Sequence, residues 1–149
     1  MPGYKGHIAG ALSATGAALG GAWWLGLYRP GPQVMLMLAF LAVLGALFPD
    51  VDTSSKGRRL YYSAAAVADA ALIAVKQYKM AAVLGFCAIL PAVGGHRGWT
   101  HTWWAGVVVP SAALLGAVTF LDVPWQTLAP YYLAGVLGYY SHLVLDGTL

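Results

Sequence analysis

The chain has 149 residues, of which 60% are hydrophobic and only 9% are charged, and its formal net charge is +3. So small a polar fraction cannot cover a water-soluble globule, and the few basic residues are too scattered to form a nucleic-acid-binding surface. The single cysteine, Cys87, excludes an intramolecular disulfide and a metal cluster built from cysteine alone. The composition therefore predicts an integral membrane protein.

Four apolar tracts, each free of Asp, Glu, Lys and Arg, predict membrane-spanning helices. A helix rises about 1.5 Å per residue, so about 20 residues cross a hydrocarbon core of about 30 Å. Each tract reaches that length, and the last one is interrupted by His142. The tracts are Ile8 to Tyr28, Pro30 to Pro49, Thr102 to Leu121 and Val123 to Leu145.

Two shorter tracts in the middle of the chain, Leu60 to Val75 and Met80 to Gly95, predict a hairpin of two further crossings. Each would be about 24 Å long as a helix, so it would need a locally thin membrane. Frequent glycine, alanine and serine residues would let the helices pack closely. The predicted fold class is therefore all-α: a polytopic transmembrane bundle of about six helices, forming a single integral-membrane domain over residues 1–149.

Counting the crossings places the polar residues of the chain at one end of this bundle. The chain leaves that end after His7, returns to it at Asp50 and Asp52, and returns again at the segment GHRGWTH, residues 95–101. The last helix ends there too, and the polar loop 53–59 is expected on the same side. All four histidines and three of the five aspartates therefore converge: His7, Asp50, Asp52, His96, His101, His142 and Asp146.

This set of imidazoles and carboxylates predicts a metal site. Without a thiolate cluster, such ligands suit Zn, with Mn or Fe also possible, and seven candidates leave room for one or two divalent ions. His142 and Asp146 are four residues apart, on one face of a helix, and a histidine inside an apolar helix needs a partner. A single histidine or aspartate at a helix end is more often a cap, so the prediction rests on their convergence.

The order of four motifs resembles the YdjM-like family of bacterial membrane-bound proteins, described as metal-dependent hydrolases. The motifs are GHIAGA, LFPDVDTSSKGRRL, GGHRGWTHTWW and LGYYSHLVLDGTL, of which HRGxTH and PDxD together are specific. The resemblance implies that Arg97 and Thr100 belong to the site beside the seven candidate ligands. The chain differs from the family at Thr53, where members often carry histidine, in its longer connection from Leu60 to Gly95, and in ending soon after Asp146, where relatives continue.

These observations predict a membrane-embedded hydrolase that acts on a phosphoester or lipid-like substrate. The metal would activate water, Asp50 or Asp52 would act as general base, and an arginine would neutralise the phosphate. Two alternatives stay open: a non-enzymatic metal transporter or metal-responsive protein, and a structural protein whose polar cluster ties helices together. The catalytic candidates are Asp50, Asp52, Arg97 and Thr100, and the substrate-binding candidates are Arg58, Arg59 and Arg97.

The basic residues predict the location of this site. The expected compartment is the bacterial cytoplasmic (inner) membrane, with membrane lipid as the partner and no nucleic acid. The site end carries more basic residues than the other end, which favours the cytoplasmic side by the positive-inside rule. Lys5, Lys56, Arg58, Arg59 and Arg97 lie at the site end, and Arg29, Lys76 and Lys79 lie at the other.

Overall fold

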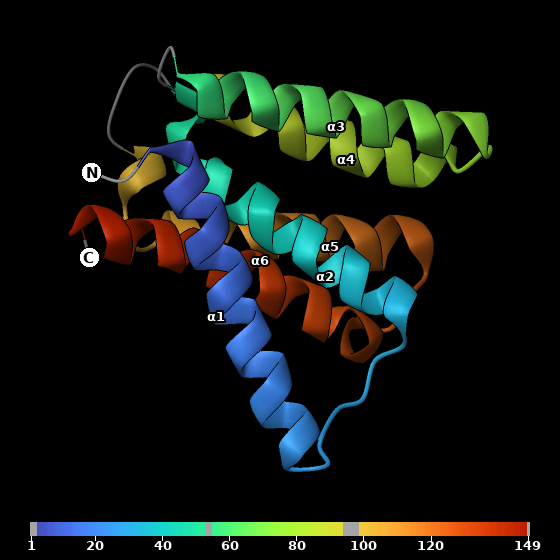
Figure 1. The fold of residues 1–149 in the computed structure, drawn as a ribbon. Coiled ribbons are helices and arrows are strands. Elements are labelled where there is room, and N and C mark those ends of the chain that lie inside the picture. Colours follow the sequence, from blue (N-terminus) through green and yellow to red (C-terminus); the bar gives the residue numbers. More distant parts are fainter. Residues whose placement is uncertain (1–2, 53–54, 94–98, 149) are drawn as a thin grey trace.

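The computed structural model describes residues 3–52, 55–93 and 99–148 of the chain. Over these residues the protein is all-helical, with six α-helices, two short 3-10 helices and no strand (Figure 1). The all-α class and the six helices predicted from the sequence are thus confirmed. The elements are α1 (Tyr4–Trp24), α2 (Pro32–Leu47), η1 (Pro49–Asp52), α3 (Lys56–Ala74), α4 (Tyr78–Val93), η2 (Trp99–His101), α5 (Ala105–Leu121) and α6 (Trp125–Asp146).

Helix α1 is shifted toward the N-terminus relative to the apolar tract that predicted it. It begins at Tyr4 instead of Ile8, so His7 lies inside its first turn and not before the helix. The helix ends at Trp24, before the turn that contains Gly26 with a φ of +70°. This shift matters because His7 is held by helical backbone and not by a free N-terminal segment.

Helix α3 also begins earlier than predicted, at Lys56 instead of Leu60. Its N-cap is Ser55, whose side-chain oxygen accepts a hydrogen bond of 3.0 Å from the backbone N–H of Arg58. The sequence predicted a polar loop over residues 53–59, and this was wrong for residues 56–59, which belong to the helix. Both arginines of this segment project from the first turns of a helix.

In the described part of the chain, no helix combines the length and the apolarity that crossing a membrane requires. Helices α2, α4 and α5 have only 16, 16 and 17 residues. Helices α1, α3 and α6 are longer, but glycine, serine, threonine, tyrosine and tryptophan residues make α1 and α6 less apolar, and four charged residues do so in α3. The six predicted membrane crossings are therefore not confirmed.

The helices are arranged around α6, which contacts α1, α2 and α5. Helices α3 and α4 form a hairpin that joins the rest through contacts of α4 with α5 and of α3 with η1 and α2. Figure 1 shows this hairpin as a separate layer beside α2, α5 and α6, and it shows both termini at the same end of the molecule. The largest apolar core joins these layers through buried side chains that include Leu47, Phe48, Tyr61, Tyr139 and Leu143.

Helices α2 and α6 pack backbone against backbone. A Cβ atom added at Gly138 would lie 2.0 Å from the carbonyl oxygen of Ala42, and one added at Gly45 would lie 2.3 Å from that of Gly135. Only glycine fits at these two positions, as at other close helix crossings. Since His142 follows Gly138 by one turn of α6, this contact brings its side chain against the end of α2.

Candidate metal centre

Five of the predicted ligands come together at one end of the bundle, as the counting of crossings predicted. His7 comes from the first turn of α1, Asp50 from η1 and His101 from η2, while His142 and Asp146 come from the last turns of α6. Figure 1 shows the start of α1 and the end of α6 at this same end. Two trios have ligand atoms within 4.8 Å of one another: His7, Asp50 and His142, and His101, His142 and Asp146.

His142 belongs to both trios, and its ring orientation is fixed by the backbone of α2. The side chain is fully buried, and its Nδ1 lies 2.7 Å from the carbonyl oxygen of Ala46. A carbonyl oxygen only accepts hydrogen bonds, so Nδ1 carries the proton and donates it. In the neutral ring, Nε2 therefore presents a lone pair, which is the form in which histidine binds metals.

The neighbours of this lone pair are carboxylate oxygens. His142 Nε2 lies 3.3 Å from Asp146 Oδ2 and 3.9 Å from Asp50 Oδ1, and His7 Nε2 lies 3.5 Å from Asp146 Oδ1. These separations exceed the usual range of about 2.7 to 3.2 Å for an N–H···O hydrogen bond. Two ligands at about 2.0 to 2.1 Å from a tetrahedral ion lie about 3.3 to 3.4 Å apart, so the spacing fits a coordination shell better than a hydrogen-bonded pair.

Several buried polar atoms of this cluster lack hydrogen bonds. Within the described residues, His7 Nδ1, His142 Nε2 and Asp146 Oδ1 have no hydrogen-bond partner. A buried polar atom without a partner costs free energy, and a buried carboxylate costs more. A bound cation would compensate this cost, because it would accept the lone pairs of imidazole and carboxylate together.

The rings of His7 and His101 both contact the ring of His142. The His7 ring stacks on it with centroids 3.8 Å apart at 20°, and the His101 ring meets it at 5.5 Å and 67°. His101 also contacts Thr100, whose Oγ1 lies 3.4 Å from His101 Nδ1. The Thr100 side chain is buried, and the backbone carbonyl oxygen of Thr100 accepts a hydrogen bond from the Tyr139 hydroxyl. Thr100, predicted as a catalytic residue, thus lies in the site beside His101.

Asp50 is the more accessible of the two carboxylates. Its side chain is 21% exposed, compared with 5% for Asp146. The start of α3 supports it: the Ser55 hydroxyl donates to the Asp50 carbonyl oxygen at 3.3 Å, and a Cβ at Gly57 would lie 3.3 Å from Asp50 Oδ2. Asp50 thus lies between the buried histidines and the surface, where water can reach it.

The remaining predicted site residues lie apart from the histidine–carboxylate cluster or outside the described residues. His96 and Arg97 are outside the described residues, and Asp52 ends η1 with its side chain outside them. The two arginines of α3 diverge: the guanidinium of Arg58 lies over the ring of Tyr62 at 5.9 Å, whereas Arg59 lines a surface pocket. The two guanidinium groups therefore have different neighbours.

Three contributors to the site were not predicted from the sequence. The Ala46 carbonyl orients His142, the Tyr139 hydroxyl binds the Thr100 backbone, and Gly138 permits the close crossing. A backbone carbonyl gives no sequence signal, because every residue has one. The tyrosine could have been suspected, since a buried tyrosine usually finds a partner for its hydroxyl.

The fold and the site together define a class: an all-helical protein with a buried cluster of histidines and carboxylates at one end of its bundle. The model of the family described as YdjM inner membrane protein matches residues 5–148, and the chain belongs to this family. The resemblance predicted from the motifs is thereby confirmed, and the matched range includes all seven candidate ligands. The comparisons with curated proteins and with solved structures found no match.

Proposed function

We propose that this inner membrane protein is a metal-dependent hydrolase whose centre holds one divalent ion. The observation that supports this most strongly is the surroundings of His142: its Nδ1 is engaged by the Ala46 carbonyl, and its Nε2 faces two carboxylates at non-hydrogen-bonding distances. A lone pair facing two anions is unfavourable unless a cation lies between them. Protonation of His142 would also supply a positive charge, but a proton would favour shorter N–H···O contacts than these.

One ion is favoured over the two that seven candidate ligands would allow. Both trios contain His142, and only its Nε2 is available, so the trios describe alternative ligands of one ion and not two full sites. Each trio offers two imidazoles and one carboxylate. This donor set is typical of catalytic zinc with an open position and also of Mn or non-haem Fe.

The chemistry of the residues suits hydrolysis of a phosphoester or lipid-like substrate. A bound divalent ion supplies positive charge that polarises a phosphoryl or carbonyl oxygen. Asp50, partly exposed beside the buried histidines, would take the proton from the attacking water as general base. Asp146, almost fully buried and 3.3 Å from His142 Nε2, would instead be the carboxylate ligand of the ion.

The proposed setting is a multi-pass arrangement in the inner membrane with the site at the cytoplasmic face. Basic residues predominate at the site end, in agreement with the positive-inside rule. Helices of 16 and 17 residues, such as α2 and α5, would need a thin bilayer around the bundle. A substrate carrying a phosphate would then meet the site at the depth of the lipid headgroups.

Metal analysis of the purified protein tests the proposal. We expect plasma mass spectrometry to find about one Zn, Mn or Fe per chain, and His142→Ala to lower this content to about a tenth or less. Asp122→Asn is the matched control, because this exposed carboxylate lies in the turn after α5. If His142→Ala proves unfolded by its thermal midpoint, Asp146→Asn provides the same test with the side-chain size preserved. Protein that contains no transition metal when purified without chelators would contradict the centre.

Turnover is measured on the same preparations, by release of phosphate from phosphatidic acid. We expect Asp50→Asn to reduce the rate at least about a hundredfold, as loss of a general base does, while Asp122→Asn keeps it. Metal binding without turnover on lipid or soluble phosphoesters would instead support a non-enzymatic metal-binding or transport protein.

A further inference from the structure

A surface pocket opens between the first residue of α1 and the first two turns of α3. It is a shallow, open depression with a volume of about 320 Å³. Two cationic side chains, two hydroxyls and one aliphatic side chain line it: Lys56, Arg59, Tyr4, Ser63 and Leu60.

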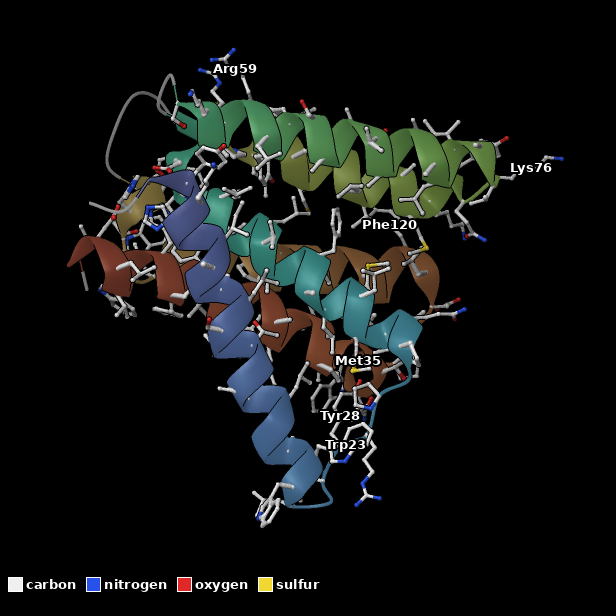
Figure 2. All side chains as sticks on the ribbon, viewed as in Figure 1. Trp23, Tyr28, Met35, Arg59, Lys76 and Phe120 are labelled. Carbon is white, nitrogen blue, oxygen red and sulfur yellow. The ribbon has the colours of Figure 1, made fainter. Side chains whose placement is uncertain are left out.

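The side chains that line this pocket favour binding of an anion. Lys56, Arg59 and Ser63 are spaced i, i+3 and i+7, so one face of α3 presents an ammonium, a guanidinium and a hydroxyl together. The described lining contains no carboxylate. Arginine binds phosphate through two parallel N–H···O bonds, and lysine adds a point charge. Figure 2 shows Arg59 projecting outward from the start of α3, where a ligand can reach it.

The pocket and the metal centre share their supporting elements. Tyr4 precedes His7 by three residues, within the first turns of α1. On α3, Gly57 lies between the two cationic residues of the pocket in sequence, and its backbone packs against the Asp50 carboxylate. The pocket therefore lies on the same two helix ends, of α1 and α3, that carry His7 and support Asp50.

We infer that this pocket binds the phosphate group of the substrate, with Arg59 and Lys56 as its charged contacts and Arg58 outside it. The inference rests on the proposed hydrolase function and names its substrate class as a phosphate ester. The Leu60 side chain, 38% exposed at the pocket, gives the phosphate an aliphatic neighbour, as a lipid phosphate requires. Arg58 is a natural control because its guanidinium is directed to the ring of Tyr62.

Calorimetric titration of the purified full chain in detergent tests the pocket, with dihexanoyl phosphatidic acid and inorganic phosphate as separate probes. Dihexanoylglycerol, which lacks phosphate, is the negative probe. We expect Arg59→Gln and Lys56→Gln each to weaken binding of phosphatidic acid about tenfold, and Arg58→Gln to weaken it less than about threefold. All three variants should retain the metal content of the native protein, because none of these residues belongs to the centre.

The two probes distinguish the source of the phosphate. Arg59-dependent binding of phosphatidic acid alone supports a lipid phosphate, and equal Arg59-dependent binding of both probes supports any free phosphate. Equal losses in Arg58→Gln and Arg59→Gln, or binding of dihexanoylglycerol as tight as that of phosphatidic acid, would overturn the pocket. Absence of metal together with Arg59-dependent binding would contradict the hydrolase but support the phosphate site, whereas a metal-loaded chain that binds neither probe would overturn the pocket alone.

Discussion

The crossing of α2 with α6 and the attachment of the α3–α4 hairpin are two very different kinds of helix contact. At the crossing, the backbones touch, and a Cβ at Gly138 would lie 2.0 Å from the Ala42 carbonyl oxygen. In the hairpin, a Cβ at Gly85 would meet nothing within 4 Å, and Phe86 is 62% exposed. Figure 2 shows side chains, Phe120 among them, between the hairpin and the other helices.

This difference indicates which parts of the molecule set the geometry of the site. His142 is oriented by a backbone carbonyl of α2, so its position depends on the distance between two helix backbones. The hairpin contributes through Gly57 and Ser55, which support Asp50 from the surface side. We therefore expect His142, held between α2 and α6, to have a rigid position, and Asp50, supported by α3, to be able to shift.

The largest effect is expected from Gly138→Ala at the crossing. Because the added Cβ would meet backbone and not a flexible side chain, the helices must separate, at a cost of about 3 kcal/mol or more in free energy of unfolding. The metal content per chain should fall as well, because separation of the helices moves the Ala46 carbonyl away from His142 Nδ1. Thermal unfolding in detergent followed by metal analysis measures both.

Gly135→Ala is the matched control on the same helix, because a Cβ there meets nothing within 4 Å. It should leave the metal content unchanged and raise stability slightly through higher helix propensity, by about 1 kcal/mol at most. Equal effects of the two substitutions would contradict the view that the α2–α6 crossing determines the site.

A smaller effect is expected from Gly57→Ala, the corresponding substitution on the hairpin side. Its Cβ would lie 3.3 Å from Asp50 Oδ2, the end of a side chain that can shift by a few tenths of an ångström. The thermal midpoint should change little, and metal affinity should fall about threefold, equivalent to about 0.7 kcal/mol. Competition with a chelator of known affinity measures this, and a loss as large as that of Gly138→Ala would show that the hairpin is equally rigid.

The sequence was sufficient to predict the convergence of His7, Asp50, His101, His142 and Asp146. That prediction needed only the number of helices between them, and it did not depend on where each helix began. Element boundaries were less accurate: the start of α3 was missed because the tract was defined by apolarity, whereas the helix is started by the cap of Ser55.

The shift of α3 explains why the roles of its two arginines could not be separated from the sequence. In a loop, Arg58 and Arg59 would be interchangeable, but on a helix neighbouring residues point about 100° apart. One consequently lies over Tyr62 and the other lines the pocket. The hydrogen bond from His142 to Ala46 depends on tertiary packing between two distant helices, and no local pattern encodes it.

X-ray absorption spectroscopy of the purified protein, at the edge of whichever metal is found, tests the metal centre most directly. We expect a first shell of nitrogen and oxygen at about 2.0 to 2.1 Å, with the outer-shell scattering of coordinated imidazole and no sulfur. That imidazole signal should fall in His101→Ala. A sulfur shell at about 2.3 Å, or a shell of oxygen alone, would contradict a centre built on His142 and its neighbouring histidines.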